Sequence, residues 1–458
     1  MPQPIHIQDA RLAQYMRLFL HVFSLPCEVA NQTKPSNPGK RSTSQSLPQW
    51  KYFVTVLLGL LHCDERRTLS ALLRHVAVKV TIFGLCYFLR AAPWSVDELT
   101  AVRQAQFYAQ VAPLVAAAHA EQRAQRPRRR GRPKRTVVTG YLIIDDSTHA
   151  KRYARAQEGL GNHYSSTEKK VVNGHSLYQS VYVLQDRQFP LTPRMYRRKV
   201  TCEAEGVPFA SKIDMAYEQV TTFEPPPDTH THLLIDSWYM AKRIWRAARQ
   251  RGWDVTGGLK SNRVMRVIDP DGTRRWVKVR EYAADLTADA FEQVIWPTEK
   301  GDKVVYGHLV KTWVRKLGPC QVLIVKLDPD DDLEHTRYWA ASRLEDTLEQ
   351  VVGHAAQRWT TEVLFADLKE LMGSDHYQIR SARGIVRFWA LGLCLYQFLD
   401  EVRATHYRLW GERLTLGQAR QQIRESHWEG LVDWIFDQVQ AGAARNEIRQ
   451  ALQPAMRL

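Results

Sequence analysis

The alternation of apolar and polar residues predicts helices at both ends of the chain and strands between them. Amphipathic stretches such as LAQYMRLFLHVF and DELTAVRQAQFYAQVAPLVAAAHA predict a helical N-terminal domain over residues 1–125. Within it, Ser95 followed by Glu98 is a helix-capping signal. The apolar runs TVVTGYLIIDD and VVNGHSLYQSVYVLQD then predict buried strands. A helical tail of mixed charge is expected over residues 401–458.

The order of the predicted elements in the middle of the chain indicates the fold class. Over residues 137–263, three strands are followed by helix, strand, helix and strand. This order is that of a ribonuclease H-like core, an α/β fold in which helices flank a mixed sheet. Short alternating segments with a Pro-Asp-Gly turn predict a β-rich insertion over residues 264–320, after which the core should resume over residues 321–400. Because single cores rarely exceed about 250–300 residues, we expect two or three domains.

The charge of the chain favours a polyanionic partner. Its formal net charge is +16, which points to DNA or RNA more than to an acidic small molecule, with ribosomal or membrane-surface binding as alternatives. The segment 121–136 alone carries eight Arg or Lys and one Glu. Within the basic linker 126–136, the Arg130-Gly131-Arg132-Pro133 sequence resembles an AT-hook, in which Arg130 and Arg132 would enter a narrow minor groove. The alternative is a solvated linker.

Cysteine usage and hydropathy exclude other classes of protein. The six cysteines are scattered without a CxxC pair, which argues against a zinc finger or a disulfide framework. The longest apolar run, residues 76–89, contains Lys79 and is shorter than the roughly 20 residues that span a bilayer, so no membrane partner is expected. Because the N-terminal residues show no secretory signal pattern, we expect a cytoplasmic protein.

Three widely separated acids form the candidate catalytic set. Asp145 in YLIIDD and Asp236 in HLLIDS each lie where an apolar run ends, and Glu362 lies in RWTTEVLFADLK between Arg358 and Lys369. Arg358, Glu362 and Lys369 share one face of a helix at this spacing. Cleavage of phosphodiester bonds is served by two Mg²⁺ ions roughly 3.5–4 Å apart, which a few carboxylates can hold. We therefore predict a two-ion Mg²⁺ or Mn²⁺ site on the three acids, with Arg358 and Lys369 binding phosphates.

Each of these residues has a simpler interpretation. An Asp after a strand is commonly a turn or cap residue, and cations around Glu362 can be a surface ion pair. Asp146 competes with Asp145 as first ligand, but Asp145 continues the in-out pattern from Ile143. Other DNA contacts are less specific: Lys260 and Arg263 for backbone phosphate, and the insertion tryptophans for stacking on an extruded base, although core packing is more probable for at least two of the three (Trp276, Trp296 and Trp313).

These motifs resemble those of the DDE transposases of bacterial insertion sequences, in the cut-and-paste group with a Tyr-x2-Arg-x3-Glu-x6-Lys signature. Arg358, Glu362 and Lys369 match the signature, whereas Ala355 stands at the Tyr position. The resemblance implies an enzyme that binds terminal inverted repeats, nicks them with water and joins the ends to target DNA. In this group the reaction often passes through a DNA hairpin. It also implies a homodimer acting at the bacterial nucleoid. A ribonuclease H-like nuclease without strand transfer and a domesticated DNA-binding protein are the alternatives.

Overall fold

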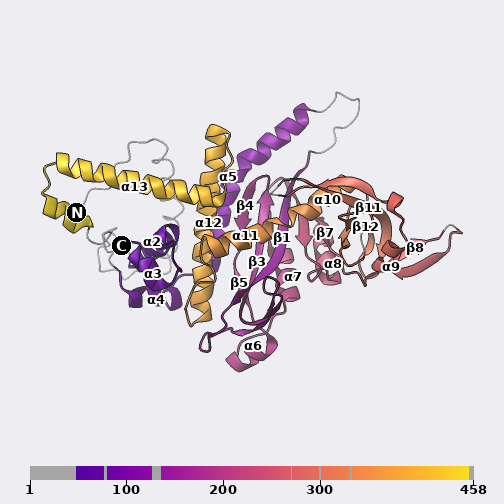
Figure 1. The fold of residues 1–458 in the computed structure, drawn as a ribbon, viewed down its shortest axis with the longest axis horizontal. Coiled ribbons are helices and arrows are strands. Elements are labelled where there is room, and N and C mark those ends of the chain that lie inside the picture. The colour runs from indigo at the N-terminus through magenta and orange to yellow at the C-terminus, as the bar shows by residue number, and fades with distance from the viewer. Residues whose placement is uncertain are drawn as a thin grey trace, which may run out of the picture.

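A computed structural model describes residues 48–76, 80–125, 136–269, 271–298, 301–330 and 333–452. It shows a mixed α/β protein in which helices flank one large mixed sheet (Figure 1). Arg130 and Arg132 of the predicted AT-hook lie outside the described residues. No helix of the described part is long and apolar enough to cross a membrane.

Within the described residues, the sheet has thirteen strands in the order β2-β3-β1-β6-β7-β13-β12-β11-β8-β9, with β4 and β5 paired to β3 and β10 paired to β11. The strands are β1 Val138–Ala150, β2 Gly161–Ser165, β3 Lys170–Leu184, β4 Arg187–Pro190, β5 Arg194–Tyr196, β6 Thr229–Ile235, β7 Asp254–Gly258, β8 Val264–Ile268, β9 Arg274–Lys278, β10 Glu292–Trp296, β11 Lys303–Val314, β12 Gly318–Lys326 and β13 Arg337–Ala341.

Strand β1 is long and apolar, and its pairing places the candidate acids. It runs antiparallel to β3, with Asp145 opposite Gln179. It runs parallel to β6, with Ile144 opposite Ile235. Because the two parallel strands are in register at these residues, Asp145 and Asp236 follow adjacent positions. Asp236 lies just beyond β6 as predicted, but β1 does not end at Asp145 and continues to Ala150.

Helices cover both faces of this sheet. The described helices are α2 Pro48–His62, α3 Leu69–Arg74, α4 Ile82–Arg90, α5 Val96–Ala124, α6 Lys199–Glu205, α7 Lys212–Thr222, α8 Lys242–Gln250, α9 Val279–Ala284, α10 Leu348–Gln357, α11 Thr360–Glu370, α12 Ala382–Trp410, α13 Leu416–Gln440 and α14 Arg445–Leu452, with a 3-10 turn at Ala288–Ala290. Ser95 Oγ accepts the backbone N–H groups of Asp97 and Glu98 at the start of α5, which confirms the capping signal.

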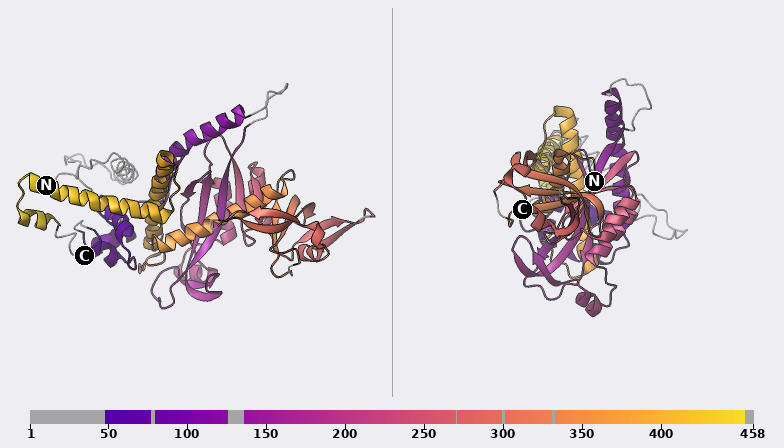
Figure 2. Two further views of the ribbon diagram at one scale, coloured as in Figure 1. Left: turned by 45° about the horizontal axis from the view of Figure 1, so that its top comes forward. Right: turned by 90° about the vertical axis from the view of Figure 1, so that its right-hand side faces the viewer.

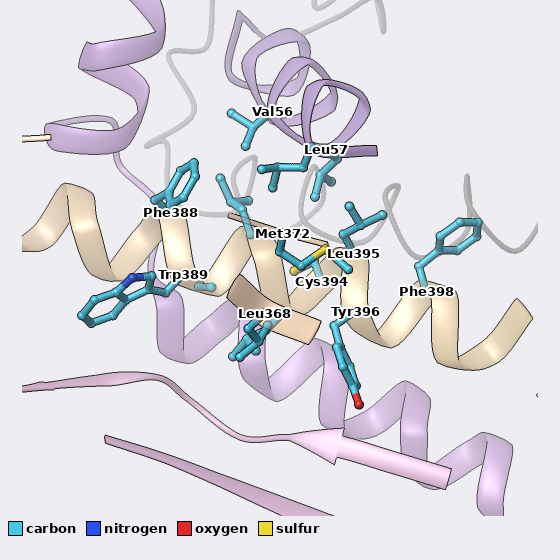
Figure 3. Packing of buried hydrophobic residues seen from close by; sticks show 14 of the residues in the cluster. Val56, Leu57, Leu368, Met372, Phe388, Trp389, Cys394, Leu395, Tyr396 and Phe398 are labelled. Atoms are coloured by element: carbon cyan, nitrogen blue, oxygen red, sulfur yellow. The ribbon is translucent and has the colours of Figure 1, made fainter. Parts of the chain in front are cut away.

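The residues of β1 point alternately to two cores. Ile143 joins α11 and α12 in one core, and Leu142 and Ile144 join α7 and α8 in the other. Figure 3 shows the first core: Val56 and Leu57 of α2 lie above α12, and Leu368 of α11 lies below it. Helix α12 therefore joins the N-terminal helices to the helix that carries Glu362. Helices α2 to α4 and α13 lie at one end of the molecule, and the β8–β9 hairpin lies at the other (Figure 1 and Figure 2).

Candidate active site

The side chain of Asp145 lies on the α11 face of the sheet. It has the same strand parity as Ile143, which packs under α11 and α12. Its Oδ2 atom accepts hydrogen bonds from Arg358 Nη1 at 3.1 Å and from Thr361 Oγ1 at 3.4 Å. Asp145 and Arg358 are 213 positions apart in the chain, so the fold creates this contact.

Asp236 lies just beyond the last residue of β6. Its Oδ1 atom accepts the backbone N–H groups of Trp238 at 2.9 Å and Tyr239 at 3.0 Å, which fixes the turn that follows the strand. Gly258 at the end of β7 is the neighbour of this turn. A Cβ atom at Gly258 would lie 2.8 Å from the Ser237 nitrogen, so only glycine allows β7 to come this close to the candidate ligand.

Glu362 lies in the first turn of α11, and Arg358 lies at the junction of α10 and α11. The sequence predicts one helix through both residues, whereas α10 ends at Gln357 and α11 begins at Thr360. Arg358 and Trp359 keep right-handed helical backbone angles across the junction, which preserves the four-residue spacing. Arg358 Nη2 donates to Glu362 Oε1 at 2.5 Å while Nη1 binds Asp145. One guanidinium therefore bridges two of the three candidate acids.

The two aspartates are costly to ionise in this position. Burial raises the pKa of Asp145 to about 7; the charge of Arg358 opposes this shift, while the charges of Asp236 and Asp146 add to it. Burial also raises the pKa of Asp236, against the lowering effects of the Tyr239 backbone hydrogen bond and of Arg358. A cation between the aspartates would offset both penalties.

The three acids are spaced more widely than the ligands of a single ion. Among the described residues, only Cys63, Glu65 and His75 bring three such donor atoms within 4.8 Å of one another. There both Glu65 oxygens already bind Arg74, at 3.2 and 2.5 Å. To hold one shared cation, the candidate acids would therefore have to approach one another.

The remaining predicted contacts differ in their surroundings. Burial lowers the pKa of Lys369, which α11 places near Asp375 and His149. Lys260 is exposed, with Nζ 5.3 Å from the Trp238 ring centroid, close to Asp236. Arg263 donates to the Met240 carbonyl at 2.5 Å and is thus held by the protein backbone. Ala355, at the signature's Tyr position, is buried in α10.

Asp146 lies on the opposite face of the sheet from Asp145. It accepts hydrogen bonds from Tyr239 Oη at 2.7 Å, Lys212 Nζ at 2.5 Å and Ser176 Oγ at 3.3 Å. These partners occupy both of its oxygens. The sequence carried no signal for Lys212 or Tyr239, because the partners come from α7 and from the turn after β6.

A cleft of about 740 Å³ opens beside Asp236 and Arg358. Three tryptophans line it: Trp296, Trp339 and Trp359. Of these three, the sequence indicated only Trp296 as a stacking candidate. Trp339 lies on a strand and Trp359 at a helix junction, where an apolar residue usually indicates core packing. The cleft adds broad aromatic surfaces to the site.

The chain matches two models of known protein families. Residues 44–280, more than half of the chain, match the family model described as DDE superfamily endonuclease. The chain belongs to this family. Residues 211–398, which include Asp236 and Glu362, match the model described as transposase DDE domain. Members of the DDE superfamily generally use divalent metal ions.

Seven chains among the solved structures match this chain. A cryo-EM structure of a piggyBac transposase synaptic complex with hairpin DNA is similar at a TM-score of 0.46 and 10% identity, over 98% of this chain and 85% of that chain. No curated protein gave a significant match.

Proposed function

We propose that the protein is a DNA transposase that cleaves transposon ends and joins them to target DNA, with Asp145, Asp236 and Glu362 as the metal ligands. The observation that carries the proposal is the Arg358 bridge between Asp145 and Glu362, next to Asp236. It joins strand β1 to helix α11, within the regions matched by the DDE models. The antiparallel β3–β1 and parallel β1–β6–β7 pairings support a ribonuclease H-like core.

The donor set suits Mg²⁺ or Mn²⁺. Three carboxylates and one guanidinium leave a formal charge of −2 when all are ionised, and hard divalent ions prefer oxygen donors on rigid elements. The raised pKa values of Asp145 and Asp236 show charges that the protein compensates incompletely. Two ions, when bound, would activate the attacking hydroxyl or water and stabilise the leaving oxygen.

The side chains around the acids would orient the DNA. The Arg358 fork can hold two phosphate oxygens once a metal replaces it at the carboxylates. Lys369 would contribute a point charge farther along α11, and Lys260 would meet backbone beyond Asp236. The tryptophan-lined cleft excludes water beside the reacting phosphate and offers flat surfaces to sugars and bases.

The proposed partners follow from the same function. The protein would bind double-stranded DNA at terminal inverted repeats and at the target, act as a homodimer on paired ends, and belong to a bacterial insertion sequence at the nucleoid. The net charge of +16 supports a DNA partner. Arg130 and Arg132 would enter a narrow minor groove, and Arg263 would add a phosphate contact.

The test is cleavage and joining by a Glu362→Gln variant. DNA that flanks the coding region supplies the candidate ends, and cleavage in Mg²⁺ or Mn²⁺ should fall by at least about 1,000-fold, since a catalytic metal contributes several kcal/mol. Glu370→Gln, an exposed carboxylate on the same helix, should keep wild-type activity. Equal cleavage by Glu362→Gln would disprove the assignment.

A joining assay with precut DNA ends distinguishes a transposase from the two alternative functions. A transposase joins them to a target plasmid, and a nuclease of the same fold does not. If wild-type protein binds DNA but neither cleaves nor joins it with any divalent metal, the protein is a DNA-binding relative that has lost catalysis.

A further inference from the structure

In the outer part of the sheet, formed by β8 to β13, the described helices leave much of one face uncovered. Helix α10 covers only part of the surface formed by β10–β13: Leu348 packs over Gly307, and Gln321 is covered by the backbone of Arg343 and Asp346, to which its side chain donates. Beyond these residues the face continues onto the end of β11 and the β8–β9 hairpin, which extends from the end of the molecule opposite α13 (Figure 1).

Strand register sorts the hairpin side chains. Met265 pairs with Val277 and Val314, and these three point into the core on the α9 side. Arg266 pairs with Trp276 and Trp313, and Ile268 pairs with Arg274, so these point to the bare face. Lys311 shares the parity of Trp313 along β11. We call the set Arg266, Ile268, Arg274, Trp276, Lys311 and Trp313 the outer face.

The outer face is both aromatic and cationic. Ile268, Trp276 and Trp313 are 62%, 51% and 42% exposed, and the Arg266 guanidinium lies 5.5 Å from the Trp313 ring centroid. Within the described residues, Arg266, Arg274 and Lys311 have no acidic partner. On the other side of the same hairpin, Arg275 does have one: its Nε donates to Asp269 Oδ1 at 2.9 Å.

The outer face also shares its sheet surface with the candidate active site. Asp145 lies on the α11 side of the sheet. Residues paired between neighbouring strands point to the same side, and on this side the pairs lead from Gly258 through Trp339 and Leu323 to β11. Five inter-strand steps separate β6 from β8. At about 4.8 Å a step the separation is roughly 24 Å, or about seven base pairs of B-DNA at 3.4 Å each.

We propose that the outer face binds duplex DNA about seven base pairs from the site of cleavage. The proposal rests on the proposed function and adds a second, remote contact to it. Arg266, Arg274 and Lys311 bind successive phosphates, and the indoles of Trp276 and Trp313 pack on deoxyribose and donate N–H groups to phosphate oxygens. A second copy of this chain is the poorer occupant, because identical cationic faces would repel one another.

The test compares duplex binding by the wild type and by the triple variant Arg266→Gln, Arg274→Gln, Lys311→Gln. The probe is a fluorescent duplex of roughly 30 base pairs of mixed sequence, titrated without divalent metal at several salt concentrations. Loss of three phosphate contacts should reduce the slope of log affinity against log salt by about 2.7, at 0.9 per phosphate. A Trp276→Ala, Trp313→Ala variant should bind more weakly with little change of slope. Arg275→Gln, on the opposite side of the hairpin, should match the wild type.

Three results would overturn the inference: an unchanged slope in the triple variant, an equal change in Arg275→Gln, or a DNA-free oligomer that dissociates when the outer face is substituted, as seen by light scattering. Circular dichroism checks that each variant is folded. Because binding is measured without metal, its outcome is independent of cleavage. Wild-type protein that cleaves DNA while the triple variant binds normally refutes only the outer face, and wild-type protein that binds through the outer face but never cleaves refutes only the transposase.

Discussion

Asp145 and Asp146 are neighbours in the chain, but their side chains lie on opposite faces of the sheet and meet different partners. On the α7 face, Asp146 receives three hydrogen bonds, one of them from a lysine that serves no other carboxylate in the described residues. On the α11 face, Asp145 shares one guanidinium with Glu362. The protein thus compensates the charge of Asp146 with its own side chains.

The charge of Asp145 is compensated less completely. Arg358 is divided between two carboxylates and lies near a third, and burial still raises the pKa of Asp145 to about 7. A site built only for stability would not retain this penalty, because a neutral side chain of the same shape would avoid it. The difference between the two faces therefore supports our proposal that Asp145 is a metal ligand, whereas Asp146 stabilises the fold.

The largest difference between the two faces is expected when each Asp is neutralised separately. Asp145→Asn should lose at least about 1,000-fold in metal-dependent cleavage, since it removes a ligand of a metal that contributes several kcal/mol. Asp146→Asn should cleave within a few-fold of the wild type at a permissive temperature, but should lose about 1–3 kcal/mol of stability because Lys212 is left without its partner. Single-turnover cleavage and urea denaturation measure the two effects. If Asp146→Asn is the inactive and stable variant, the two faces have been assigned the wrong way round.

Removal of the shared guanidinium should give a smaller effect. Arg358→Met leaves the acids with a formal charge of −3 in place of −2, so divalent ions should bind more tightly. The cleavage rate at saturating metal should nevertheless fall by about 10- to 100-fold, because two charge-assisted phosphate contacts are lost. Arg358→Lys, which keeps the charge but loses the fork, should retain the wild-type metal affinity. Weaker metal binding by Arg358→Met would show instead that Arg358 positions the acids.

The sequence was sufficient for the local features of this site. The apolar run before Asp236 predicted the end of β6, whereas β1 continues past Asp145 to Ala150. The four-residue spacing predicted the contact of Arg358 with Glu362. The alternation from Ile143 placed Asp145 on one face and Asp146 on the other. Each of these follows from the periodicity of a single strand or helix.

Long-range contacts could not be obtained in this way. The contact between Arg358 and Asp145 spans 213 positions, and neither Lys212 nor Trp339 stands in a pattern that indicates its partner. Strands β8 to β11, predicted only as a β-rich insertion, extend the central sheet. Pairing between distant strands depends on which faces fit together in three dimensions, and periodicity along one segment does not contain that information.

The smallest expected effect is on the pH dependence of stability, which should also distinguish the two faces. The pKa of Asp145 is about 7 in the folded protein against a usual value of 3.8, so between these values the folded state binds more protons than the unfolded state. The contribution of Asp145 to stability therefore falls as pH rises from about 4 to 7, and it stays low above pH 7. Metal-free Asp145→Asn lacks this contribution and should be more stable than the wild type by about 1–2 kcal/mol at pH 8, but not at pH 4. Urea denaturation at both pH values measures the difference. A larger gain at pH 4 than at pH 8 would mean that Asp145 is stabilised in its ionised form, and the contrast with Asp146 would then disappear.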